Sequence, residues 1–105
     1  MKVLMVCSGG MSSAIVVKAV KAEADRQKFD LEINAVGTSE FEDELATKEY
    51  DLAIVAPQVK HRFETFKSQA SQYNVPIELI IPMGYTPLGA SKTLEQIKKY
   101  KKWLI

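Results

Sequence analysis

The sequence predicts an α/β fold in which one parallel sheet is covered by helices on both faces. Short apolar runs, typical of strands buried on both sides, alternate with longer stretches of helical periodicity. Four of each imply right-handed crossovers and the flavodoxin-like strand order 2-1-3-4. A chain of 105 residues with 47% hydrophobic residues is large enough for a core of its own, so we expect a single domain over residues 1–105.

The first strand and helix occupy the start of the chain. Val3–Val6 is a continuous apolar run rich in branched residues, which predicts a buried strand. From about residue 12 to residue 28, alanines and charged residues dominate, and Ile15, Ala19 and Ala22 lie on one face of the predicted helix.

The second unit begins with "LEINAV" at residues 31–36, whose alternation is typical of an edge strand. Ser39 and Glu42 have the spacing of a capping box at a helix start. The helix that follows is short and acidic, and Phe41 and Leu45, four residues apart, pack it against the sheet.

The third unit starts with "DLAIVA" at residues 51–56, a second buried strand that Pro57 ends. The next helix is predicted from apolar residues that recur at steps of four and three and so share one face: Val59, Phe63, Phe66, Ala70 and Tyr73.

The fourth unit begins with "VPIELIIP" at residues 75–82, a strand bounded by prolines. A loop, "MGYTPLGA", follows at residues 83–90 and leads into the last helix. Leu94, Ile97 and Leu104 line one side of that helix.

Composition excludes several classes of protein. The 14 basic and 13 acidic residues are interspersed and give a net charge of +1, which excludes the basic stripe of a nucleic-acid-binding protein. Cys7 is the only cysteine, so it forms no internal disulfide, and a cytoplasmic protein without a metal or other cofactor is expected. No apolar run approaches the roughly 18 residues of a membrane span.

Cys7 is the candidate catalytic residue because it ends the first strand, beside the point where the strand order reverses. Parallel sheets hold their sites outside the carboxyl ends of the strands. The loop "CSGGMSS" then runs into a helix, so backbone N–H groups and the helix dipole favour an anion there. Gly9 and Gly10 permit a tight turn, and hydroxyl groups come from Ser8, Ser12 and Ser13.

A cysteine followed by an anion-binding loop also describes low-molecular-weight phosphatases and arsenate reductases. Those enzymes carry arginine six residues after the cysteine, where this chain has Ser13, and no Asp-Pro general-acid loop is present. These differences favour a protein that accepts a phosphoryl group and passes it on. A phosphatase-like or reductase-like cysteine enzyme, or a non-catalytic anion-binding module, remains the alternative.

Three features together resemble the cytoplasmic IIB component of the lactose/cellobiose branch of the bacterial phosphoenolpyruvate-dependent sugar phosphotransferase system. They are the opening "KVLMVCSGGMSSAIVVKAV", the block "DLAIVAPQVKHRF" and the total length. The resemblance implies that Cys7 becomes phosphorylated. It also implies a phosphate loop made of Ser8, Gly9, Gly10, Met11, Ser12 and Ser13, with Gly9 where alanine is common.

The same resemblance implies the partners. A phosphohistidine of the IIA component is the donor, and a sugar translocated by the membrane IIC component is the acceptor. The sugar is expected to be a disaccharide such as cellobiose, lactose or chitobiose. The chain would then be a phosphocysteine–sugar phosphotransferase, a monomer when free, recruited to the inner face of the membrane through IIC.

Other residues near this end give weaker signals. Pro57 and Gln58 follow the third strand, and Gln58 either contacts the phosphoryl group or bonds to the backbone at the helix start. His61 is expected on an exposed rim rather than as a base for Cys7. Met11 and Tyr85 either contact partners or pack locally. A solvated face is expected for the basic residues near the chain end: Lys98, Lys99, Lys101 and Lys102.

Overall fold

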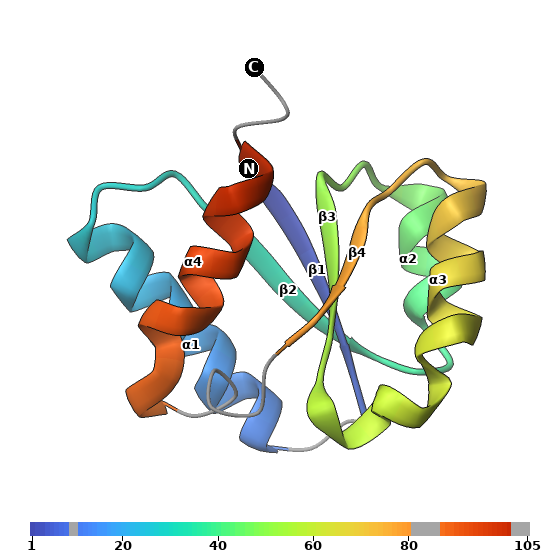
Figure 1. The fold of residues 1–105 in the computed structure, drawn as a ribbon, viewed down its shortest axis with the longest axis horizontal. Helices are drawn as coiled ribbons and strands as arrows, with labels where there is room; N and C mark the ends of the chain where they lie inside the picture. Colours follow the sequence, from blue (N-terminus) through green and yellow to red (C-terminus); the bar gives the residue numbers. More distant parts are fainter. Residues whose placement is uncertain (9–10, 81–86, 102–105) are drawn as a thin grey trace.

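A four-stranded parallel sheet lies between two helical layers in this computed structural model, which describes residues 1–8, 11–80 and 87–101 (Figure 1). The strand order is β2-β1-β3-β4, with β1 pairing in parallel with both β2 and β3. The predicted fold class and strand order are therefore confirmed.

Strands and helices alternate along the described residues. The strands are β1 (Lys2–Cys7), β2 (Glu32–Gly37), β3 (Leu52–Val55) and β4 (Ile77–Leu79). The helices are α1 (Met11–Arg26), α2 (Phe41–Thr47), α3 (Phe63–Gln72) and α4 (Ala90–Lys101), with short 3-10 helices η1 (Pro57–Arg62) and η3 (Pro87–Gly89).

The central strands are buried because helices cover both faces of the sheet. In β1, Val3 and Met5 pack with the cluster beneath α1 and α4, whereas Leu4 and Val6 pack with the cluster beneath α2 and α3. Leu94 and Ile97 of α4 are fully buried in the first cluster, as predicted, and Leu104 lies outside the described residues.

The second cluster is centred on two aromatic rings. Phe41 of α2 and Phe66 of α3 are both fully buried, and their ring centroids lie 5.3 Å apart in an edge-to-face arrangement. The prediction that Phe41 and Leu45 pack α2 onto the sheet is confirmed, since Leu45 is also buried.

The predicted buried face of α1 is wrong by one residue. Ile15 is 51% exposed and Ala22 is exposed, whereas Ala19 of the predicted set packs partly against the core. The buried face is formed by Val16, Val20 and Ala24. Two apolar sets on this helix differ by about 100° in direction, and the set that faces the sheet has two branched side chains, Val16 and Val20, whereas the other has one. Ile15 is left on the surface.

The predicted capping box at Ser39 and Glu42 does not form. The N-cap of α2 is Glu40, with no side-chain cap hydrogen bond, and the Glu40 N–H donates to the Gly37 carbonyl at 3.1 Å in a turn. This turn places the helix start one residue later than predicted, so Glu42 is not at the third helical position.

The helix predicted after the third strand is divided. Its first part is η1, and the backbone is non-helical at Val59 (φ −117°, ψ 21°) before α3 begins at Phe63. Phe66 and Ala70 are buried as predicted, but Tyr73 follows the end of α3 and is 37% exposed.

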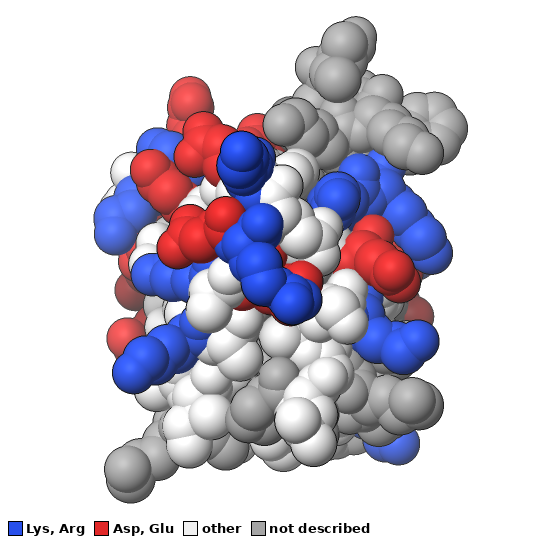
Figure 2. All heavy atoms as spheres, turned by 90° about the vertical axis from the view of Figure 1, so that its left-hand side faces the viewer, with Lys and Arg blue, Asp and Glu red and all other residues white. Residues whose placement is uncertain are grey.

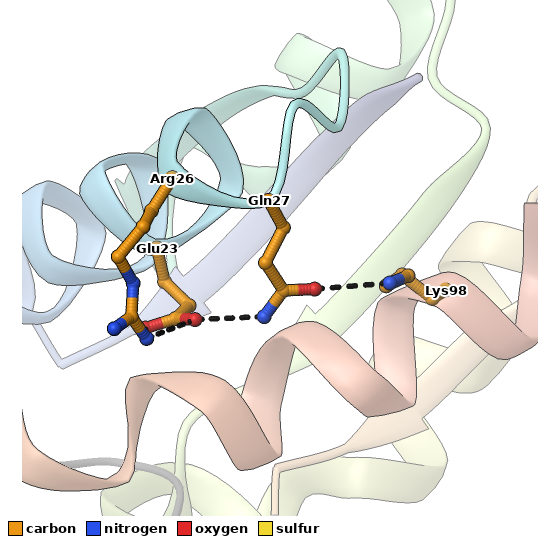
Figure 3. Close-up of polar contacts among 4 residues, drawn as sticks. All are labelled: Glu23, Arg26, Gln27 and Lys98. Atoms are coloured by element: carbon orange, nitrogen blue, oxygen red, sulfur yellow. Dashed lines mark hydrogen bonds and ion pairs between the residues drawn. The ribbon is translucent and has the colours of Figure 1, made fainter.

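Side chains tie the end of α1 to α4 (Figure 3). Lys98 Nζ donates to Gln27 Oε1 at 3.0 Å, and Gln27 Nε2 donates to Glu23 Oε2 at 2.7 Å. Arg26 also pairs with Glu23. Lys98 is exposed, as predicted, but it also links α4 to the end of α1 through its hydrogen bond to Gln27.

Of the other lysines near the chain end, Lys99 is exposed, as predicted. Lys102 and the side chain of Lys101 lie outside the described residues. Within residues 1–8, 11–80 and 87–101, none of the helices combines the length and apolar character that crossing a bilayer requires.

Candidate functional site

Cys7 is the last residue of β1, at the carboxyl end of a central strand. It lies opposite Gly37 of β2, and the chain crosses from β1 to β2 on one side and reaches β3 on the other. Cys7 therefore lies beside the reversal of strand order, as predicted. In open parallel sheets this is the place where ligands bind.

The Cys7 thiol is sheltered. The residue is only 3% exposed, and its Sγ donates a hydrogen bond to the Val36 carbonyl of β2 at 3.5 Å. It packs with the cluster that includes Ala56 and Val59. The thiol thus bonds to one neighbouring strand, β2, and Cys7 packs in one cluster with the start of η1. The sequence analysis did not predict either contact.

Helix α1 begins at Met11, four residues after Cys7. Ser8 forms an exposed bend, while Gly9 and Gly10 lie outside the described residues, as do the side chains of Met11, Ser12 and Ser13. The first turn of this 16-residue helix contains no acidic residue, so no side-chain carboxylate of that turn offsets the positive end of the helix dipole. This arrangement favours an anion near the strand end.

The start of η1 lies at the same end of the sheet. The Ala56 N–H donates to the Val6 carbonyl at 2.9 Å, and the Val59 N–H donates to the Ala56 carbonyl at 3.1 Å. Pro57 is half-buried and Gln58 is exposed between these anchored residues. The structure thus brings Pro57 and Gln58 to the end where Cys7 lies, while any role of Gln58 stays a prediction.

The other candidate residues contribute less. His61 is exposed on η1, as predicted, and Tyr85 lies outside the described residues. Among the side chains that the structure describes, no three His, Cys, Asp or Glu residues gather as metal ligands would. The chemistry that the described part of the site offers is therefore that of a single thiol near a helix start.

Two exposed apolar side chains lie toward this end of the molecule. Ile15 is near the start of α1, and Leu88, which is 99% exposed, belongs to η3, a segment that contacts α1. Figure 2 views the molecule from the side of α1 and α4. On this side, charged side chains crowd the upper part, and the described side chains of the lower part, toward the carboxyl ends of the strands, are mostly uncharged. Exposed apolar groups on an uncharged surface are typical of contact sites.

Comparison with known proteins agrees with this geometry. The family model described as "PTS system, Lactose/Cellobiose specific IIB subunit" matches residues 2–96. The "PTS system oligo-beta-mannoside-specific EIIB component" of Bacillus subtilis (strain 168) is 30% identical over 95 residues, which cover 90% of each chain.

Two solved structures share the fold. The lactose-specific IIB component domain from Streptococcus pneumoniae has a TM-score of 0.72 at 24% identity, with 91% of this chain and 95% of that chain covered. The cellobiose-specific phosphotransferase IIB component from Borrelia burgdorferi has a TM-score of 0.74 at 22% identity, with 95% and 90% covered.

Proposed function

We propose, from the premise that this chain belongs to the lactose/cellobiose-specific IIB family of the sugar phosphotransferase system, that Cys7 carries the phosphoryl group. The observation that supports this most is the position of Cys7. The chain's only cysteine ends a central strand and is followed within four residues by a helix start without acidic side chains.

The proposed reaction has two steps. In the first, Cys7 Sγ attacks the phosphorus of a phosphohistidine on the IIA component. The S–P bond forms as the N–P bond breaks, and the thiol proton passes to the imidazole that leaves. In the second, a sugar hydroxyl attacks the same phosphorus, the S–P bond breaks, and the sulfur receives the hydroxyl proton.

The site must hold the phosphoryl group without hydrolysing it. Ser13 stands where phosphatases of similar loop pattern have arginine, so the guanidinium that would stabilise the equatorial oxygens during hydrolysis is missing. We infer that backbone N–H groups of the loop at residues 8–13, together with its hydroxyl groups, bind the phosphoryl oxygens. Because Cys7 is 3% exposed, each transfer requires the surface over the sulfur to rearrange.

The partners follow from the same proposal. A IIA donor and a membrane IIC permease must each reach Cys7, and we infer that the exposed Ile15 and Leu88 contact them. The chain would act in the cytoplasm and be recruited to the membrane by IIC. We propose a β-linked disaccharide such as cellobiose, lactose or chitobiose as the sugar.

The test is phosphoryl transfer followed by mass measurement of the intact chain. Incubation with phosphorylated IIA should add one phosphoryl group, and peptide mapping should locate it on Cys7. Iodoacetamide applied beforehand should block the reaction, since Cys7 is the only thiol. A Ser71→Ala variant, changed at an exposed position of α3 away from the loop, should still be labelled. Phosphorylation of a Cys7→Ala variant would overturn the proposal.

A further inference from the structure

The Glu40 carboxylate lies against Gly37, the last residue of β2. A Cβ atom added to Gly37 would stand 3.2 Å from Glu40 Oε1, so this oxygen lies beside the space that the glycine leaves open. The turn in which the Glu40 N–H donates to the Gly37 carbonyl at 3.1 Å brings the two residues together. Glu40 is also the N-cap of α2, yet its side chain makes no cap hydrogen bond.

Gly37 is the residue of β2 that pairs with Cys7 of β1. Adjacent strands lie about 4.8 Å apart, and the Cβ positions of paired residues point to the same face of the sheet. The Glu40 carboxylate therefore lies within about 10 Å of the Cys7 sulfur. Figure 1 shows both places at the lower end of the sheet, where β1 ends and α2 begins.

The charge of Glu40 is not neutralised by a neighbour. Glu40 is exposed, and among the side chains that the structure describes, no lysine, arginine or histidine forms an ion pair with it. An unpaired carboxylate acts on a second charge at this distance through the surrounding medium. Water and salt weaken the interaction, but at low ionic strength they do not remove it.

We propose that Glu40 destabilises the phosphorylated form of Cys7 by charge repulsion and so keeps the phosphoryl group transferable. This inference rests on the proposed function of Cys7. A phosphoryl group carries a charge of about −1.5 to −2, so phosphorylation places like charges within about 10 Å of each other. Glu40 does not touch the group. It raises the free energy of the phosphorylated chain relative to that of the free thiol.

Two electrostatic effects then act on the phosphoryl group in opposite directions. The start of α1, which has no acidic side chain in its first turn, favours an anion near Cys7. Glu40, from the side of β2, disfavours one. Without Glu40 the group would be bound more firmly, and the phosphorylated thiol would be a weaker donor. An intermediate that must accept a group and then release it requires such a balance.

The test is the equilibrium of phosphoryl exchange between phosphorylated IIA and the full chain, measured from the intact masses of both proteins. At an ionic strength of about 0.01 M, Glu40→Gln should shift the equilibrium constant about three- to tenfold toward phosphorylated Cys7. This constant does not depend on how tightly IIA docks, so a role of Glu40 in partner contact would not change it. A shift of less than about twofold, or a shift toward phosphorylated IIA, would overturn the inference.

Salt dependence separates an effect of charge from an effect of structure. At an ionic strength of about 1 M the Debye length is only about 3 Å. The equilibrium constants of the native chain and of Glu40→Gln should then agree within about twofold. A difference that persists undiminished at high salt would mean that the substitution alters the loop around Cys7, and it would overturn the inference.

Two further variants are controls. Glu49→Gln removes the same charge from an exposed position just before β3, at the amino end of the sheet, and should leave the equilibrium constant unchanged. Glu40→Asp keeps a carboxylate and should stay closer to the native value than Glu40→Gln. The unfolding midpoint of Glu40→Gln should not move, since the side chain makes no cap hydrogen bond. An equal shift from Glu49→Gln would contradict a role for the position of Glu40.

The result is distinguishable from failure of the proposed function. If Cys7 accepts no phosphoryl group, neither the native chain nor Glu40→Gln gains mass, and both proposals fail. If both chains become phosphorylated with the same equilibrium constant at low salt, the proposed function stands and only the role of Glu40 is overturned.

Discussion

At the amino end of the sheet, polar side chains from several elements bind one another, whereas at the carboxyl end Cys7 packs among apolar side chains and its thiol donates to a backbone carbonyl. Tyr50 OH donates to Glu44 Oε1 at 2.8 Å and accepts from Asn34 Nδ2 at 3.4 Å, and Lys48 pairs with Glu44 at 2.9 Å. The hydrogen bond from Lys48, followed by that of Tyr50, holds the pKa of Glu44 below its usual range.

The carboxyl end instead combines one sheltered thiol with exposed apolar groups. Cys7 makes one hydrogen bond to a backbone carbonyl, and Ile15 and Leu88 project from nearby elements. The amino end stabilises the fold, and the proposed function assigns contact with partners to the carboxyl end. Substitutions at the two ends should therefore have separable effects, which the following predictions test in order of size.

The largest effect is expected from Cys7→Ala, which should lower phosphoryl transfer about a hundredfold or more because no other thiol is present. Its unfolding free energy should fall by only about 1 kcal/mol, since a small side chain replaces a small one. Transfer from phosphorylated IIA and urea unfolding measure the two quantities. Retained transfer would show that the carboxyl end works through another group.

A smaller loss of transfer is expected from Leu88→Ser. Because Leu88 is 99% exposed, its removal should leave stability unchanged but slow transfer about tenfold if it contacts a partner. Tyr73→Ser is the matched control, since Tyr73 is an exposed aromatic residue at the amino end. Equal rates for both variants would remove Leu88 from the contact surface.

The reverse pattern is expected from Tyr50→Phe at the amino end. Loss of the hydroxyl breaks two hydrogen bonds and should lower the unfolding free energy by about 0.5–1.5 kcal/mol, with transfer unchanged. Tyr73→Phe, at an exposed position, is the control. A change in transfer rate without a change in stability would contradict the division between the two ends.

The smallest effect near neutral pH is expected from Tyr100. Burial, aided by the hydrogen bond to Glu78, raises the pKa of Tyr100 to about 12. A raised pKa favours the protonated form in the folded state, so this stabilisation is full below the ordinary tyrosine value near 10 and is lost as pH rises toward 12.

Denaturant unfolding at several pH values measures this effect. The native chain should lose stability between about pH 10 and 12, and Tyr100→Phe should lose less over the same range. Identical alkaline profiles would exclude Tyr100 as the group responsible.

The sequence predicted the sheet order and the position of Cys7 because both depend on long-range burial. The runs at Val3–Val6 and in residues 51–56 are apolar without alternation, which only a strand covered on both sides requires. The face of α1 was not predictable from spacing alone, since Ile15 and Val16 each begin an apolar set. Contact with the sheet decides between them.

Local signals near loops were less reliable for a physical reason. The turn closed by the bond from the Glu40 N–H to the Gly37 carbonyl makes Glu40 the N-cap, so Ser39 and Glu42 no longer occupy the two positions that a capping box requires. The contact between Cys7 and Val36 involves a carbonyl, which every residue has. No choice of side chain at position 36 could have revealed it.

The hydrogen bond from Cys7 to Val36 also offers a spectroscopic label. A phosphorylated or alkylated sulfur has no proton to donate, so the Val36 carbonyl loses this donor whenever Cys7 is modified. The carbonyl carbon resonance of Val36, isotopically enriched, should then shift with the chemical state of a side chain on the adjacent strand. Occupancy of Cys7 becomes readable in real time without a dye, an antibody or any substitution in the chain.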